Sequence, residues 1–395
     1  MIQFTCLPKH ISNWLQVLRP MFRHRHHLIF CWLLVCQAVY QEKATIKGLA
    51  RLAPRHIAEW HFRRLLAATY WNWRLLLWWF ADQVMATLPP PEDGVCYLVV
   101  DSTLKGKTGQ KHPLAKKGRL NEYAPYIVGL HLVVVMLQWG NYRIPVDFEI
   151  VRRKDHPRYR SENALFRWML ARFRRPSWAE MVVVVADAAF ASKANLQLIQ
   201  RRGYFFVMAF ARTWCFENGH ALKALVTHLP KHHYRRCWVP LDAPGRRRTY
   251  WTYTKWARLR HIGDVTIVLS KQRRNDGPKQ TKILVTNLPD ARARQVVDVY
   301  RRRWSVELLM KELKGATGLG QHQVTKDPQR VERSLAMSVM AYLMIVKWHA
   351  QDIPQKGPWS MYTLKRNFMW QLALGQLKRA AEQRLQKELW ERKAA

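Results

Sequence analysis

The sequence contains few acidic side chains. Only 27 of its 395 residues are Asp or Glu, whereas 66 are Lys or Arg, so the formal net charge at pH 7 is +39. These cations are spread over the whole chain rather than gathered in a tail. We therefore expect a polyanionic partner.

Cysteine pairs and long apolar runs are also missing. The six cysteines form no CxxC pair and no Cys/His zinc spacing, which argues against a disulfide framework or a zinc site and favours reduced thiols. The longest apolar runs, 28–36 and 127–139, are too short or too interrupted for a membrane-spanning helix. The N-terminus lacks the pattern of a signal peptide. We expect no membrane partner and a cytoplasmic protein.

Aromatic side chains are abundant and are interleaved with arginine. The chain has 19 Trp and 14 Tyr. Most of these rings belong in the core, but stacking surfaces beside phosphate-binding cations are typical of nucleic-acid-binding proteins. Nucleic acid is therefore a better expectation than a membrane surface.

Composition and periodicity divide the chain into several regions. A hydrophobic content of 49% indicates a globular protein, and 395 residues suffice for two or three domains. Apolar positions at helical spacing fill the first 90 residues, and the three prolines of the segment 87–94 end that region. The regions are a helical N-terminal domain (1–90), for which we expect DNA binding because of its basic side chains, the first part of a core of strands and helices (95–211), a β-rich insertion (212–288), a helical completion of that core (289–350) and a helical C-terminal region (351–395).

The core region has a recognisable order of elements. Three strands, a helix, a strand, a helix and a further strand follow one another between 95 and 211. This order predicts an α/β fold with a ribonuclease-H-like mixed sheet, followed by an all-β insertion. Helical N- and C-terminal regions flank it.

Residues 44–66 predict a short helix, a break at Pro54 and a second, basic helix. This arrangement could be a helix-turn-helix that presents cations to a DNA groove. Two amphipathic helices joined at a proline look alike without that function, so both readings stay open. The side chains concerned are Arg55, His56, His61, Arg63 and Arg64.

Three carboxylates are candidates for chemistry. Asp101 and Asp187 each follow a hydrophobic strand, and Glu307 lies in the predicted helix 300–315. In a ribonuclease-H-like sheet the first and fourth strands are neighbours, so the two aspartates meet at one edge, and the helix brings the glutamate there. Such acids are ligands for two Mg²⁺ ions, or Mn²⁺, that promote phosphoryl transfer. The alternative is that each aspartate only caps a turn.

The helix 300–315 carries a basic and aromatic face around its acid. At about 100° per residue, Tyr300, Arg303, Glu307 and Lys314 fall within about 60° of one another. The cations could hold phosphates, or they could form ordinary surface ion pairs. Glu312 lies about 140° from Glu307, which argues against it as the third metal ligand.

These residues resemble the signature of a known family. The spacing Tyr-x2-Arg-x3-Glu-x6-Lys, filled by Tyr300, Arg303, Glu307 and Lys314, is similar to that of the YREK group of DDE transposases of the insertion-sequence-four type. Around the second aspartate, Asp187 to Phe190 matches Asp-x-[Gly/Ala]-[Phe/Tyr], and Asp101 with Ser102 and Thr103 resembles the first-aspartate motif. The resemblance covers about 95–350.

The resemblance implies a cut-and-paste DNA transposase. Asp101, Asp187 and Glu307 would be the catalytic metal ligands, and Tyr300, Arg303 and Lys314 would bind DNA. The implied partners are double-stranded transposon ends and target DNA, bound by a homodimer in the bacterial cytoplasm near the nucleoid. In the best-known members an aromatic side chain of the insertion stacks with a flipped base, and the candidates here are Trp238, Trp251 and Trp256.

Two other functions remain open. One is a catalytically inactive, domesticated DNA-binding protein, although all three carboxylates are present. The other is a structure-specific nuclease on the same core, which would not need Tyr300, Arg303 and Lys314. Metal-dependent strand joining separates all three.

Overall fold

The computed structural model describes residues 4–106, 112–118, 125–241, 245–322, 327–352 and 360–394. The chain divides into two compact units. The sheet unit comprises Pro90–Gln110 and Ala115–Leu309, and the helical unit comprises Met1–Pro89, Lys111–Leu114 and Met310–Ala395. The N-terminal and C-terminal helices thus share one unit. The division into five domains stays a prediction.

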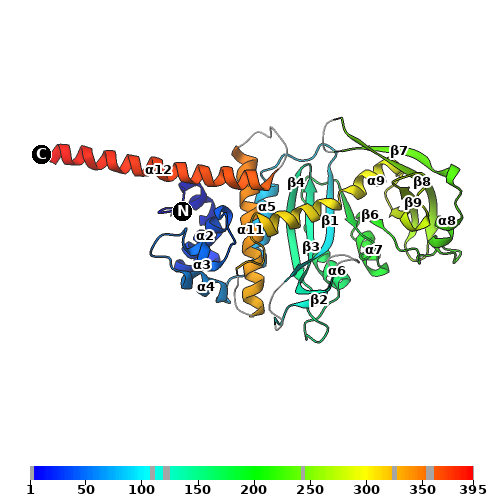
Figure 1. The fold of residues 1–395 in the computed structure, drawn as a ribbon, viewed down its shortest axis with the longest axis horizontal. Helices are drawn as coiled ribbons and strands as arrows, with labels where there is room; N and C mark the ends of the chain where they lie inside the picture. The colour runs from blue at the N-terminus through cyan, green and yellow to red at the C-terminus, as the bar shows by residue number, and fades with distance from the viewer. Residues whose placement is uncertain are drawn as a thin grey trace. The chain divides into compact units, whose positions relative to one another are not determined.

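The helical unit is packed around a long helix, α11 (Pro328–Asp352). It contacts α2 (His24–Val39), α4 (Glu59–Ala67) and α5 (Trp73–Met85) (Figure 1). The side chain of Asn72 caps α5 by accepting a hydrogen bond from the backbone N–H of Arg74 at 3.0 Å. The described residues before Pro89 contain no strand, which confirms a helical N-terminal region. This unit also contains α1 (Lys9–Gln16), α3 (Ile46–Ala50) and α12 (Met361–Ala394).

The helices α3 and α4 lie on either side of Pro54 and contact each other. This arrangement confirms a helix, a break and a second helix within residues 44–66. The second helix begins only at Glu59, so Arg55 and His56, which were predicted to lie on it, are in the preceding turn. Its DNA-binding role stays a prediction.

The sheet unit begins with the strands of the predicted core. β1 (Val95–Gly106) pairs antiparallel with β3 (Ile127–Trp139), which pairs antiparallel with β4 (Tyr142–Ile150). β5 (Met181–Ala186) runs parallel to β1, and β6 (Phe205–Ala209) runs parallel to β5. Valines 182 to 185 are buried, as expected of a central parallel strand. The predicted neighbourhood of the first and fourth strands is therefore confirmed.

Helices connect the parallel strands. α6 (Glu162–Arg172) packs on β3 and β4, and α7 (Lys193–Arg201) packs on β6 (Figure 1). Ser161 and Ser192 cap these two helices with their side-chain oxygens. The predicted order of strands and helices between 95 and 211 is confirmed, with the addition of a short strand β2 (Lys116–Gly118) beside β3.

The region 212–288 continues the same sheet. Its four strands form an antiparallel meander, and the last of them pairs with β6. The complete order is β2-β3-β1-β5-β6-β10-β9-β8-β7, with β4 beside β3. The new strands are β7 (Arg235–Pro240), β8 (Arg247–Leu259), β9 (Gly263–Lys271) and β10 (Lys282–Thr286).

Two details of the sequence prediction are wrong here. The insertion is not all-β, because it contains α8 (Leu222–His228), in which Leu222 and Val226 are buried four residues apart on one helix face. Asp101 does not end its strand, because β1 continues to Gly106 through its pairing with β3.

Among the described residues, no helix combines the length and the apolar character needed to cross a membrane.

Candidate active site

Strand register places Asp101 and Asp187 on one row of the sheet. The parallel pairing of β1 and β5 ends with Val99 opposite Val185, and each aspartate lies two residues beyond its valine. Asp187 accepts a hydrogen bond from the backbone N–H of Ala189 at 2.9 Å, which starts the turn after β5. Both carboxylates therefore lie at the edge of the sheet where the parallel pairing of β1 and β5 ends.

Glu307 is connected to this edge through Arg303. The guanidinium of Arg303 donates to Asp101 Oδ2 at 2.6 Å and to Glu307 Oε1 at 2.9 Å. The side chains of Arg303 and Asp101 are only 19% and 14% exposed, whereas that of Glu307 is 40% exposed. One arginine thus joins a strand residue and a helix residue that are 206 positions apart in the chain.

The charges of the three carboxylates act on one another. The pKa of Asp101 is raised to about 6, mainly by burial and also by the negative charges of Asp187 and Glu307, against the opposing effect of Arg303. Burial acts to lower the pKa of Arg303, but the charges of Asp101, Tyr300 and Glu307 outweigh it and raise that pKa. The site is a set of mutually repelling acids around one fixed cation.

The predicted single helix over 300–315 is wrong. The structure has α9 (Ala293–Arg301) and α10 (Trp304–Gly315), separated at Arg302 and Arg303. In this turn the N–H groups of Arg303 and Ser305 bond to carbonyls three residues earlier, and the hydroxyl of Ser305 donates to the carbonyl of Arg302. These bonds replace the α-helical pattern and tighten the chain locally. The break leaves Arg303 in the turn between the two helices.

Tyr300 and a lysine that the sequence did not indicate lie beside the acids. Burial raises the pKa of Tyr300, which also interacts with Arg303 and Asp187. The Lys282 ammonium lies 5.6 Å from the Tyr300 ring centroid, and burial, Arg303 and Arg248 lower its pKa. Lys282 is the first residue of β10, two positions before Leu284, which pairs with Ala209 of β6. Strand periodicity alone gave no sign of this neighbourhood.

The remaining residues of the predicted helix face belong to the helical unit. Lys314 lies in the last turn of α10, where its backbone carbonyl accepts a hydrogen bond from the Gln321 side chain at 2.9 Å. Glu312 is buried and accepts from the Tyr342 hydroxyl at 3.1 Å. This bond agrees with the prediction that Glu312 is not the third metal ligand. The sheet unit therefore brings together Asp101, Asp187, Tyr300, Arg303 and Glu307.

The donor set fits a hard divalent cation in its chemistry. Carboxylate oxygens are the preferred protein ligands of Mg²⁺ and Mn²⁺, and the mutual repulsion that raises the pKa of Asp101 would be relieved by a cation. Within the described ranges, no three His, Cys, Asp or Glu side chains are arranged as a metal cluster. Arg303 occupies the bridging place between Asp101 and Glu307, so a cation there would exchange with the guanidinium.

Comparisons with known proteins give one family. The model of a family described as "Transposase DDE domain" matches residues 96–344, a range that includes Asp101, Asp187 and Glu307. No curated protein matches the chain. A similar solved structure is a piggyBac transposase in a synaptic complex with hairpin DNA, at 13% identity and a TM-score of 0.46, covering 95% of this chain and 80% of that one.

Proposed function

The chain belongs to the transposase DDE domain family, and we propose that it is a cut-and-paste enzyme that cleaves DNA at transposon ends and joins them to target DNA. The observation that carries this proposal is the row shared by Asp101 and Asp187, with Glu307 held beside it through Arg303. A ribonuclease-H-like assignment of the core agrees with the adjacent parallel strands β1 and β5.

Each carboxylate has a role in this proposal. DDE transposases generally use divalent metals, and Asp101, Asp187 and Glu307 would hold two Mg²⁺ ions, or Mn²⁺, which supply Lewis acidity for in-line displacement at phosphorus. In the cleavage step a water oxygen bonds to phosphorus, the bond to the 3′ oxygen breaks, and a proton reaches that oxygen to give a 3′ hydroxyl. In the joining step the oxygen of this hydroxyl would lose its proton and bond to a phosphorus of the target strand. The bond from that phosphorus to the target's own 3′ oxygen would break, and a proton would reach that oxygen to give a new 3′ hydroxyl.

Arg303 and Tyr300 would then position the DNA. Arg303 forms ion pairs with Asp101 and Glu307 in this structure, so a cation bound by the acids would leave the guanidinium able to pair with a phosphate. Tyr300 lies next to it with its ring partly buried. We assign the same phosphate-binding role to Lys314, in agreement with the YREK signature of the insertion-sequence-four type.

Among the tryptophans of the insertion, Trp251 is our candidate for stacking with a flipped base. It directly precedes Thr252, which pairs with Ser270, and Ser270 in turn pairs with Lys282 beside the acids. Trp256 is more exposed, at 69%, but lies four residues from that row. This order along the sheet favours Trp251.

The partners follow from the same proposal. Two double-stranded ends must be brought together before joining, which suits a homodimer, and the basic helices of the N-terminal region would contribute to end binding. A chromosomal substrate places the enzyme with the bacterial nucleoid. The N-terminal DNA-binding domain of residues 1–90 is part of this proposal.

The decisive experiment uses a duplex that carries an inverted repeat flanking the gene. We expect nicking at the repeat boundary and joining of the new 3′ end to a second duplex, both only with Mg²⁺ or Mn²⁺. Cleavage without joining would favour a structure-specific nuclease. Binding with neither reaction would favour an inactive DNA-binding protein.

A further inference from the structure

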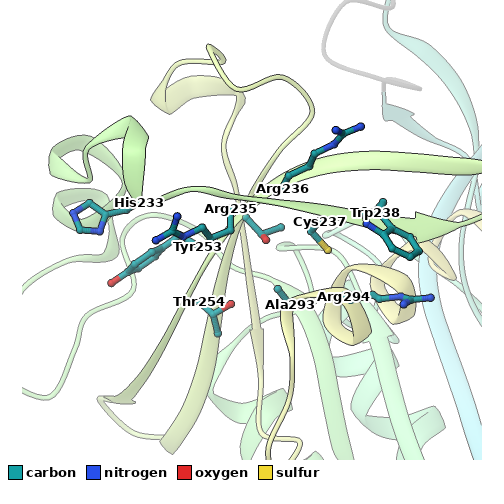
Figure 2. Close-up of a pocket in the computed structure, with 10 residues that line it drawn as sticks. His233, Arg235, Arg236, Cys237, Trp238, Tyr253, Thr254, Ala293 and Arg294 are labelled. Atoms are coloured by element: carbon teal, nitrogen blue, oxygen red, sulfur yellow. The ribbon is translucent and has the colours of Figure 1, made fainter.

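A second basic site of the sheet unit lies outside the carboxylate cluster. It is a cavity of about 530 Å³ bounded by β7, β8 and the first turn of α9 (Figure 2). We call it the arginine–tryptophan pocket, defined by Arg235, Arg236, Trp238 and Arg294, together with Arg247 over the Trp238 ring. Neither the DDE family match nor the YREK signature assigns a role to it.

The charge of this pocket is not compensated. The side chains of Arg235, Arg236 and Arg294 are exposed. None of them has a carboxylate partner among the residues that the structure describes, and no acid lines the cavity there. Three cations around an open cavity form a site for an anion.

Trp238 holds two of the arginines in place. The guanidinium carbons of Arg247 and Arg294 lie over its ring, at 4.3 Å and 4.8 Å from the centroid. Figure 2 shows Trp238 of β7 facing Arg294 at the start of α9. A stacked guanidinium keeps its N–H edges available, and their fork matches phosphate oxygens. A base would have to displace a guanidinium from the ring, so the stack favours phosphate over base.

The pocket lies on the same edge of the sheet as the acids, and α9 connects the two regions. Arg294 and Tyr300 are six residues apart on α9, about 9 Å along the helix axis. Trp238 pairs with Thr249, three residues beyond the row of Thr252, Ser270 and Lys282, on the same edge of the sheet as the carboxylates. Arg248 directly precedes Thr249 on β8, and its charge lowers the pKa of Lys282. A basic path leads from the acids to the pocket.

We propose that the arginine–tryptophan pocket binds phosphates of the duplex backbone a few nucleotides from the scissile phosphate, because the axial separation of Arg294 and Tyr300 alone exceeds two steps of about 3.4 Å along one strand. This inference rests on the proposed function, because it places the pocket on the DNA that enters the active site. The ligand class is the phosphodiester backbone, read without regard to sequence.

The first test measures binding of a fluorescent random-sequence duplex as a function of salt. For Arg294→Gln we expect affinity to fall several-fold near 0.1 M salt and the slope of log K against log salt to become shallower by about 1. Trp238→Ala should act similarly by releasing both guanidinium groups, whereas Trp238→Phe should retain most of the affinity. Thermal melting of each variant checks that the fold is intact.

The matched control is Arg258→Gln. Arg258 is on β8 in the same unit, is 60% exposed, and faces Glu217 and Asp264 rather than the pocket. Its replacement should leave affinity and slope at wild-type values. An Arg294→Gln variant that behaves like this control would overturn the proposal. A Trp238→Ala variant that loses affinity at an unchanged salt slope would also overturn it, in favour of base stacking.

A native thiol provides an independent test. Cys237 lines the pocket, and Cys215 lies elsewhere in the insertion with similar, intermediate exposure. With duplex at about ten times its Kd, alkylation of Cys237 by N-ethylmaleimide should slow about tenfold, because only about a tenth of the protein is free, while Cys215 reacts as before. Unchanged labelling of Cys237 in a DNA-saturated protein would refute the pocket alone. Failure of the protein to bind any duplex would instead refute the proposed function.

Discussion

Arg303 and Arg294 belong to the same short stretch of chain, yet their surroundings are opposite. Arg303 is mostly buried and is ion-paired with Asp101 and Glu307. Arg294 is exposed, stacks on Trp238 and has no carboxylate partner within the described ranges. Arg303 partly compensates the negative charge of the two acids, whereas Arg294 remains available to an external anion. The basic side chains behind the net charge of +39 therefore differ in function, since the role of each depends on whether one of the few acids lies beside it.

The largest effect should come from the carboxylates. Asp101→Asn, Asp187→Asn and Glu307→Gln should each reduce strand cleavage in Mg²⁺ by about three orders of magnitude or more. Each change removes a ligand of the metal ions that stabilise the transition-state charge. Duplex binding in a gel shift should persist, since the basic surfaces are unchanged. Asp264→Asn is the control, as Asp264 is an exposed acid of the same sheet that forms an ion pair with Arg258. Cleavage near the wild-type rate would remove the altered residue from the site.

The next effect concerns pH. Because Asp101 has a pKa of about 6 in the folded protein, it gains a proton as pH falls through 6 and then cannot hold a cation. At subsaturating Mg²⁺, single-turnover cleavage should slow about fivefold between pH 6 and pH 5, because the ionised fraction of Asp101 falls from about one half to about one tenth. DNA binding by the exposed arginines should stay constant over this range. A flat cleavage profile down to pH 5 would show that Asp101 is ionised throughout.

Arg303 should shift that profile. Removal of its charge leaves Asp101 buried beside two acids and so raises the pKa of Asp101. For Arg303→Gln, the pH at which cleavage falls to half its maximal rate should therefore rise by about one unit. Arg303→Lys keeps the charge and should lie nearer to wild type. If this half-maximal pH is the same for Arg303→Gln and wild type, Arg303 does not influence the pKa of Asp101, and only its phosphate-binding role remains.

The smallest effect should come from Lys282, which lies beside the carboxylates on the basic path that leads to the arginine–tryptophan pocket. Lys282→Gln should weaken duplex binding several-fold and reduce the salt slope by about 1, as expected for one phosphate contact. Fluorescence anisotropy across a salt series measures both quantities. An unchanged slope would exclude Lys282 from the basic path between the acids and the pocket.

Much of the sheet could be predicted from local patterns. The valine run before Asp187 and the apolar run before Asp101 each specify a buried strand, and their order in the chain indicates that the two strands are neighbours. The sequence therefore placed both aspartates at one edge. The extension of β1 beyond Asp101 was not predicted, because it depends on pairing with β3.

Other features depend on contacts between distant residues. The break between α9 and α10 involves a side-chain bond from Ser305 that hydrophobic periodicity does not report. The approach of Lys282 to Tyr300 and of Arg294 to Trp238 depends on strand register and helix docking, for which neither segment carries a local signal. These cations are the part of the site that sequence reasoning missed.

The most direct test of the carboxylate assignment is the metal dependence of an Asp187→Cys variant. A thiolate binds Mg²⁺ poorly and binds softer Mn²⁺ better, so the ligand role of Asp187 predicts strand cleavage that is lost in Mg²⁺ and partly restored in Mn²⁺. Wild-type protein and the Asp264→Cys variant, assayed on the same duplex, should cleave in both metals. Cleavage by Asp187→Cys in Mg²⁺ at the wild-type rate would contradict the assignment of Asp187 as a ligand in metal-dependent phosphoryl transfer.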